Sequence, residues 1–261
     1  MRSVNSTASS VSRALLSIKS GAHGRLAAMN AGRTARDRAR AELTQEIKDA
    51  ARRQLAVEGA ERLSLRAVSR ELGMVSSALY RYFPSRDELL TALIIDAYDA
   101  LGAAAEQATR QGQDPRTNWQ AVCRAVRAWA VAHPHEYALI YGSPVAGYSA
   151  PPSTIQPAGR VATVLLGLIR QAHEAGILAP LDDAPAPSGV LDEQIAGLAA
   201  SAAPGVPAKV LTRAVIAWTQ LFGMISFELF GQLVGSVDPS EPFFDYATAQ
   251  MADFLGLAPA N

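Results

Sequence analysis

The chain has 261 residues, 49% of them hydrophobic and 18% charged, which is the composition of a soluble globular protein long enough to bury a sizeable core. It contains one cysteine, Cys123, which excludes an intrachain disulfide and fits a reducing cytoplasm. The many Ala and Leu residues, with few clusters of β-branched residues, predict an all-α fold.

The formal net charge is zero, but the charges are unevenly distributed along the chain. Residues 1–90 hold 16 Lys and Arg against nine Asp and Glu, whereas the remaining residues hold eight against 15. A basic first third followed by an acidic remainder favours a polyanion-binding module joined to a part that avoids phosphate. Chance clustering together with a basic tail is the alternative explanation.

Residues 1–36 are rich in Ser, Ala and Arg and contain no acidic residue. We expect this segment to be a disordered basic tail, although its composition also resembles an organelle-targeting sequence. A further alternative is that the natural protein begins at Met29. The segment has no continuous apolar stretch of the kind found in secretory signals.

Apolar residues recur at spacings of three and four over residues 38–58, which predicts an amphipathic helix that ends at Gly59. Ser64 is placed to cap a second helix of about ten residues, and Gly73 is placed to end it. A turn with two potential capping serines, Ser76 and Ser77, follows Gly73.

Residues 78–83 predict another short helix, because Pro84 forbids its continuation. Ser85 is then placed to cap a longer helix, whose first turn carries Asp87 and Glu88 and which we expect to reach about Gln111. Further helices are expected at about residues 118–132, 135–141, 155–174, 191–202, 208–234 and 241–255. No alternating strand pattern or internal repeat is present.

Two short helices joined by a tight turn and flanked by longer helices match the geometry that DNA readout requires. The major groove admits one helix, and the preceding helix crosses the backbone to hold the angle. The second short helix carries serines at its start and then Tyr80, Arg81 and Tyr82, groups suited to phosphate contacts.

These residues resemble the DNA-binding domain of the TetR (tetracycline-repressor-like) family. The resemblance rests on the run from Leu63 to Gly73 and on the run from Ala78 to Leu90, where Leu79-Tyr80 and Phe83 precede a basic residue and an acidic helix start. It implies a three-helix DNA-binding domain with a helix-turn-helix, over residues 37–85. It also implies a helical effector-binding and dimerisation domain over residues 86–261.

The resemblance also implies individual roles in DNA binding. Ser64 would cap the second helix and touch phosphate, Arg66 would read a base or contact phosphate, and Arg86 would grip a phosphate. The base-edge positions would be Ser76, Ser77 and Ala78, and the aromatic phosphate contacts would be Tyr80 and Tyr82, with Arg81 beside them. Tyr80 as a packing residue and Arg81 as a solvated charge are the structural alternatives.

Two residues depart from the common family pattern. Val75 stands where a small polar residue is usual, and Tyr82 replaces a frequent His. An apolar Val reads a thymine methyl group at best, so the specific base contacts are the least defined part of this interpretation.

The later segments resemble a TetR subgroup with a WHG-type C-terminal domain, on the basis of Trp129 with residues 133–137 and of residues 218–231. The helix at 208–234 is apolar on nearly all sides and so needs both a core and a partner. With the helix at 241–255 it predicts a homodimer interface of four helices. Polar residues interrupt residues 214–237, so we predict a buried helix and no membrane span.

An effector pocket between the middle helices needs aromatic residues with polar tips. The candidates are Trp129, His133, Tyr137, Tyr141, Tyr148 and Arg160, each of which has core or loop packing as its alternative role.

We therefore expect a cytoplasmic DNA-binding regulator that works as a repressor, released from a near-palindromic operator by an unknown small molecule. A constitutive DNA-binding protein without an effector is the alternative. The sequence shows no metal-ligand spacing, phosphate loop or nucleophile elbow, so we predict no enzyme, no catalytic residue, no metal and no cofactor.

Overall fold

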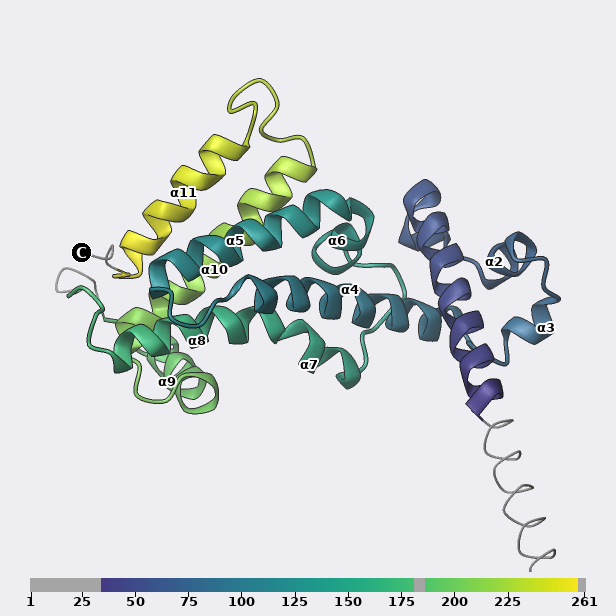
Figure 1. Ribbon diagram of the computed structural model, residues 1–261, viewed down its shortest axis with the longest axis horizontal. Coiled ribbons are helices and arrows are strands. Elements are labelled where there is room, and N and C mark those ends of the chain that lie inside the picture. The colour runs from purple at the N-terminus through teal and green to yellow at the C-terminus, as the bar shows by residue number, and fades with distance from the viewer. Residues whose placement is uncertain (1–33, 181–185, 258–261) are drawn as a thin grey trace, which may run out of the picture.

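The computed structural model describes residues 34–180 and 186–257, and in these ranges the secondary structure is helical apart from one isolated β-bridge between Leu178 and Leu257. The expectation of an all-α fold is confirmed. The expected tail at residues 1–36 lies almost wholly outside the described residues. Figure 1 shows two lobes, a small one at the N-terminal end and a larger one that contains the remaining helices.

The N-terminal lobe is built from a helix over residues 34–58, the short turn η1 (Ala60–Arg62), α2 (Leu65–Glu71), α3 (Ser76–Leu79) and the start of α4 (Arg86–Ala108). The apolar faces of these elements converge on one core, as the sequence periodicity predicts. The larger buried side chains of this core are Ile47, Leu55, Leu63, Leu65, Leu79, Phe83, Leu89, Leu90, Leu93 and Ile94.

The expected start and stop residues are confirmed at some helix ends and corrected at others. Gly73 ends α2 with φ of 63°, a conformation that glycine adopts without strain, and the Ser85 hydroxyl accepts a capping hydrogen bond from the Glu88 amide (3.1 Å). Ser64 occupies the N-cap position of α2, but its side chain makes no capping hydrogen bond. The N-cap of α3 is Val75, and neither Ser76 nor Ser77 is the capping residue.

The C-terminal lobe packs around a second core, into which α5 contributes the fully buried Trp119 and α6 contributes Tyr137. Its elements are α5 (Pro115–Ala132), α6 (Pro134–Tyr141), η2 (Pro152–Thr154), α7 (Ile155–Ala158), α8 (Arg160–Glu174), α9 (Val190–Ala202), α10 (Ala208–Leu229) and α11 (Glu241–Phe254).

Several of the expected helices are shorter than the sequence pattern suggested. The short helix expected at residues 78–83 is formed instead by Ser76–Leu79, and α2 has seven residues. The predicted helix at 155–174 is divided at Gly159 into α7 and α8, since Pro157 lacks an amide donor and glycine has a low helix propensity. The predicted helix at 208–234 ends at Leu229, because Gly231 adopts φ of 76° and its amide bonds back to the Glu228 carbonyl (3.2 Å).

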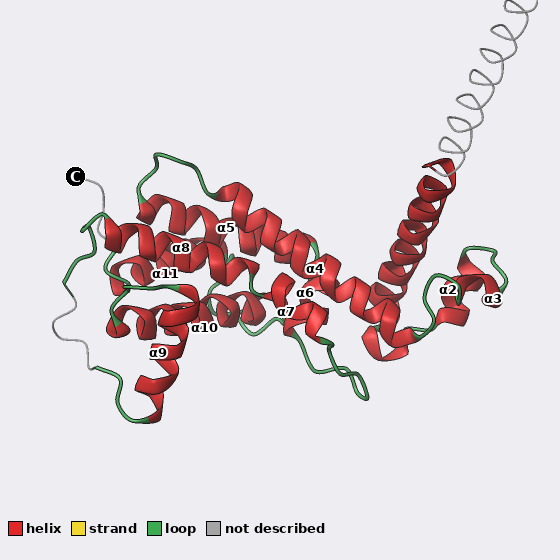
Figure 2. Cartoon of the chain, turned by 90° about the horizontal axis from the view of Figure 1, so that it is seen from below, coloured by secondary structure: helices red, strands yellow, loops and turns green. Residues whose placement is uncertain are grey.

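The long helix α4 belongs to both lobes and runs from one to the other (Figure 2). Its first turns carry Leu89 and Leu93 into the N-terminal core, and its later turns carry Ala97 and Leu101 into the C-terminal core. A displacement of α4 in one core would therefore change its contacts in the other core, because both are closely packed.

Candidate nucleic-acid interface and ligand cavity

The turn between α2 and α3 is held by several short hydrogen bonds. The Met74 amide donates to the Ser69 carbonyl (2.8 Å), and the Gly73 amide donates to the Arg70 carbonyl (3.1 Å). The hydroxyl groups of Ser69 and Ser76 lie 3.1 Å apart and join the two helices. Leu79 anchors α3 in the N-terminal core with no exposed surface, so the opposite side of α3 faces outward.

The outer side of the two helices carries most of the residues expected to contact DNA. Arg66, Ser77, Tyr80 and Arg81 are exposed. The other expected residues are half-buried: Ser64, Ser76, Ala78, Tyr82 and Arg86. All nine therefore keep some exposed surface, in the segment that runs from the start of α2 to the start of α4.

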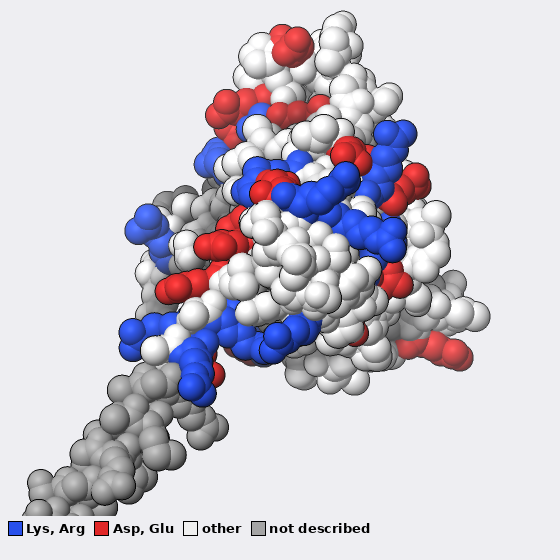
Figure 3. Space-filling view, turned by 90° about the vertical axis from the view of Figure 1, so that its right-hand side faces the viewer, with Lys and Arg blue, Asp and Glu red and all other residues white. Residues whose placement is uncertain are grey.

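Two residues of the same segment that are outside this set are exposed as well. Val75, at the N-cap of α3, is 70% exposed. Arg70 on α2 is exposed as well. Seen from this end of the molecule, Lys and Arg side chains lie on both sides of an uncharged area, with acidic groups among them (Figure 3).

Arg86 and Tyr82 are half-buried, and both contact other residues of the N-terminal lobe. The Arg86 guanidinium donates to the carbonyl oxygens of Ala60 (2.9 Å), Leu63 (3.2 Å) and Glu61 (3.3 Å), and so ties the start of α4 to η1. The guanidinium carbon of Arg40 lies 5.2 Å from the centre of the Tyr82 ring. These contacts make both residues structural parts of the lobe.

A network of ion pairs connects the two lobes near the middle of α4. Asp96 on α4 accepts from Lys48 (2.8 Å) and Arg52 (2.7 Å), both on the first helix. The Arg52 Nε atom also lies 3.3 Å from an oxygen of Glu136 on α6. No local pattern predicts this network, because its members come from three segments that are far apart along the chain and meet only in the folded protein.

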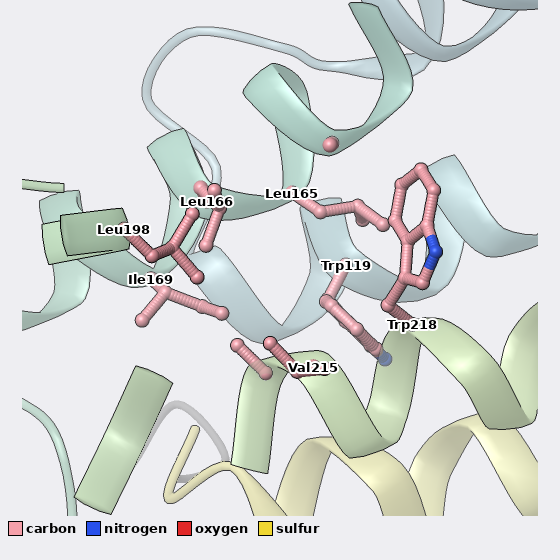
Figure 4. A pocket seen from close by; sticks show the side chains of 9 residues that line it. Trp119, Leu165, Leu166, Ile169, Leu198, Val215 and Trp218 are labelled. Carbon is pink, nitrogen blue, oxygen red and sulfur yellow. The ribbon is translucent and has the colours of Figure 1, made fainter. Parts of the chain in front are cut away.

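The C-terminal lobe contains an apolar cavity of about 250 Å³ among four helices. Figure 4 shows Trp119 and Trp218 at one end of it and Leu166, Ile169 and Leu198 at the other. The indole nitrogen of Trp119 donates to the Thr248 carbonyl (3.2 Å). The lining residues are Trp119 of α5, Ala162, Leu165, Leu166 and Ile169 of α8, Leu198 of α9, and Ala214, Val215 and Trp218 of α10.

The residues expected to bind a ligand do not line this cavity. Trp129 and His133 stack on one another with ring centres 5.0 Å apart, and Tyr137 is fully buried, with its hydroxyl 3.0 Å from the Phe222 carbonyl and 2.9 Å from the Ser226 hydroxyl. Burial raises the pKa of Tyr137, so this hydroxyl stays protonated. Tyr141 packs between other rings, and burial likewise raises its pKa.

Arg160 is held on the surface of α4. Its guanidinium donates to both carboxylate oxygens of Glu106 (2.9 and 2.7 Å) and to the carboxylate of Asp99 (2.7 Å). The side chain passes directly over Gly102, where an added Cβ would lie 2.6 Å from the Cβ atom of Arg160. Its contacts therefore fix α8 against α4.

Tyr148 lines a second, wider cavity of about 530 Å³ beside α4. Its hydroxyl lies 2.8 Å from that of Thr91 on α4. Tyr98 of α4 lines the same cavity, and the Tyr98 hydroxyl donates to the Ile140 carbonyl (3.3 Å).

A series of ring contacts runs from the first cavity to α4. Trp218, in the cavity wall, packs on Phe222 with ring centres 4.7 Å apart, and Phe222 stacks on Tyr141 at 4.2 Å. Tyr141 then meets Tyr98 of α4 edge to face at 6.1 Å. The cavity wall and the helix that joins the lobes are therefore in continuous contact.

The outer sides of α10 and α11 expose large apolar side chains. Phe227 is 56% exposed and Tyr246 is 66% exposed, and Ile216, Phe230 and Phe243 are also exposed. The exposed apolar residues of α10 are Val215, Ile216 and Phe227, and Phe230 follows the last residue of the helix. Large apolar side chains left uncovered on one helix are typical of a surface that a partner covers.

Among the described residues, α10 is one helix whose length and apolar composition would suffice to cross a membrane. It packs against α5, α9 and α11, and Glu228 near its end forms an ion pair with Arg127 of α5 (2.7 Å). These contacts are those of a core helix that has one open face.

Two family models match separate parts of the chain. The model of bacterial regulatory proteins of the tetR family matches residues 47–93, and that of a tetracyclin repressor-like C-terminal domain matches residues 119–251. The first match contains α2, α3 and the turn between them, and the second contains most of the C-terminal lobe.

Comparison with known proteins gives relatives of the same kind. HTH-type transcriptional regulators of Mycobacterium bovis (Mb1846) and Mycobacterium tuberculosis (Rv1816) are each 44% identical over 205 residues, which cover 74% of this chain and 83% of the relative. The crystal structure of SCO4313 is 36% identical, with a TM-score of 0.67 over 84% of this chain and 98% of that one. A protein from Rhodococcus sp. RHA1, 24% identical with a TM-score of 0.60, shares the fold.

Proposed function

The chain belongs to the TetR family of transcriptional regulators, and on that premise we propose that it is a repressor which a small-molecule effector releases from a near-palindromic operator. The observation that carries this proposal is the outward side of α3, anchored by Leu79 from within and tied to α2 through Ser69 and Ser76. A helix held in this way enters a major groove at a fixed angle.

We assign the DNA contacts by position and exposure. Ser76, Ser77 and Ala78, at the start of α3, would meet base edges, with the exposed Val75 beside them against a thymine methyl group. Tyr80 and Arg81 follow on the exposed side and would meet phosphates, as would Ser64, Arg66, Tyr82 and Arg86 around them. The hydrogen bonds that Arg86 makes to η1 would hold its guanidinium in place for that contact.

The working form in this proposal is a homodimer joined through α10 and α11. The exposed apolar residues on these helices, Phe227 and Tyr246 foremost, provide a face that a second copy would cover. A two-fold axis through this interface would present two α3 helices to successive major grooves, about 34 to 36 Å apart or somewhat more.

Effector release in this proposal acts through α4. The ring series from Trp218 to Tyr98 and the ion pairs of Arg160 both connect the C-terminal core to α4, which also enters the N-terminal core. A ligand that binds more tightly to a dimer with widely spaced α3 helices than to the DNA-binding dimer would lower operator affinity. The loss cannot exceed the ratio of the ligand's affinities for these two forms. A cytoplasmic location, where the DNA is, belongs to the same proposal.

Selection of bound sequences from random DNA with the purified full-length protein tests the proposal. We expect an enriched site with two related half-sites, a copy of it near the protein's own gene, and weaker binding to that copy when an effector is added. Uniform binding to all sequences, lost evenly as salt rises, would favour the constitutive DNA-binding protein instead.

A further inference from the structure

The apolar cavity between α5, α8, α9 and α10 is distinct from the positions where ligand-binding residues were expected, and its lining defines the kind of ligand it can hold. Among the residues that line it there is no charged side chain. The polar groups of the lining side chains are two indole N–H groups: that of Trp119 already donates to the Thr248 carbonyl, and Figure 4 shows the nitrogen of Trp218 on the side turned away from Leu166, Ile169 and Leu198. A charged group placed there would lose its hydration without gaining a partner.

The size of the cavity limits the ligand as well. A cavity of about 150 Å³ lined by aliphatic and aromatic side chains is known to stay dry and to bind benzene. At about 250 Å³ the present cavity is larger than that, but it is smaller than the usual sites for drug-sized ligands. It therefore suits a compact molecule of about one or two rings.

The aromatic and aliphatic side chains of the wall favour rings or branched chains over polar groups. Trp119 and Trp218 offer aromatic surface at one end, and Leu166, Ile169 and Leu198 offer aliphatic surface at the other (Figure 4). Aromatic rings prefer offset or edge-on neighbours at such surfaces. Val215 is 42% exposed and Leu166 and Leu198 are half-buried, and so these three residues lie where the cavity approaches the surface.

We propose that this cavity is a binding site for an uncharged, compact apolar ligand, aromatic or branched aliphatic. The ligand would lie against Trp218, the residue from which the ring series leads to Tyr98 on α4. This site would give the proposed function its effector class. Ligand binding itself does not depend on the proposed function, whereas the effect of the ligand on operator affinity does.

A pair of probes with the same rings and different charge tests the site. Naphthylmethanol is neutral, whereas naphthoate carries a carboxylate at the same position. In equilibrium dialysis with the full-length protein without DNA, we expect one naphthylmethanol to bind per chain and naphthoate to bind at least about tenfold more weakly. Equal affinity for the two probes would overturn the proposal.

Substitutions in the cavity wall locate the binding. Leu166→Arg supplies a cation at the half-buried edge and should reduce or reverse the preference for the neutral probe. Ala162→Trp should fill the cavity and lower naphthylmethanol affinity at least about tenfold. Val131→Arg, on an exposed part of α5 that does not line the cavity, is the matched control and should leave both affinities unchanged.

Unchanged naphthylmethanol binding in a folded Ala162→Trp variant would place the probe elsewhere and overturn the proposal. This result decides the matter even if the Leu166→Arg variant does not fold. Operator binding measured without any probe keeps the two proposals separate. Sequence-specific DNA binding with failed probe binding would count against the cavity alone. Probe binding as expected without sequence-specific DNA binding would count against the proposed function alone.

Discussion

The Nε atom of Arg52 lies 3.3 Å from a carboxylate oxygen of Glu136, and this ion pair joins the first helix of the N-terminal lobe to α6 of the C-terminal lobe. The same guanidinium donates to Asp96 on α4 at 2.7 Å. Both partners of the inter-lobe pair are about four-fifths covered, with 23% and 20% of their side chains exposed. Screening by water is thus limited, and the pair can hold the two lobes in one relative arrangement.

We expect Glu136→Gln to lower the free energy of unfolding by about 0.5 to 2 kcal/mol, because Arg52 loses one of its partners. A double-mutant cycle with Arg52→Gln, measured by urea denaturation, should give a coupling energy of about 0.5 to 1 kcal/mol. The cycle is its own control, since it removes the effects that each substitution has alone. Additive effects of the two substitutions would contradict a direct stabilising pair.

Arg81, exposed just after α3, should contact the DNA backbone. Arg81→Ala is expected to weaken binding to the selected operator and to unrelated DNA alike, and to reduce the slope of log K against log salt by about one. Fluorescence anisotropy at several salt concentrations measures both quantities. Arg170→Ala on α8 removes the same charge outside the N-terminal lobe, and a similar loss of slope there would point to a net-charge effect.

Gly102 provides the space through which Arg160 reaches Asp99 and Glu106. In Gly102→Ala the new methyl group would lie 2.6 Å from the Arg160 Cβ atom, too close to the backbone of α8 for the side chain alone to yield. We expect a loss of about 1 to 3 kcal/mol in the free energy of unfolding, measured by chemical denaturation.

Gly167→Ala is the matched control, since it lies in α8 with open space around its Cβ position. It should be neutral or should stabilise the protein by up to about 1 kcal/mol, because alanine is the better helix former. Equal effects of the two substitutions would show that helix propensity, and not the contact between α4 and α8, decides the outcome.

Glu228 on α10 makes the free energy of unfolding depend on pH. Burial alone would raise its pKa, but hydrogen bonds from Arg127 and Ser240 and the positive charge of Arg127 bring the pKa below its usual range. A carboxyl whose pKa is lower in the folded state adds stability above its unfolded pKa, and this contribution is lost as pH falls through the folded pKa.

Glu228→Gln should therefore lower the free energy of unfolding by roughly 2 to 4 kcal/mol at neutral pH and flatten the fall of stability below about pH 4.5. Denaturation at a series of pH values measures both effects. Asp245→Asn, which breaks the more exposed pair with Arg124 between α5 and α11, is the control and should cost less than about 1 kcal/mol. An unchanged pH profile for Glu228→Gln would remove this residue from the acid response.

The local pattern of the sequence was sufficient to predict most of the helices and the helix-turn-helix arrangement of α2 and α3. Apolar spacing, Gly73 as a stop and Ser85 as a cap are relations between residues within one or two turns, and these relations hold whatever the rest of the chain does. Leu79 and Phe83 are buried in the folded protein, and the exposed side of α3 follows from the burial of Leu79. Gly159 and Gly231 gave stop signals that the apolar pattern around them obscured.

The tertiary structure alone decided which polar and aromatic side chains are engaged inside the protein. The sequence suggested Arg160 as a ligand contact, but the packing of α8 on α4 pairs it with Asp99 and Glu106. Tyr137 is buried, and its hydroxyl meets Phe222 and Ser226, which lie more than 80 residues away along the chain. The cavity likewise needs walls from four helices. Such contacts depend on how distant segments pack, and helical periodicity carries no information on that packing beyond which face is apolar.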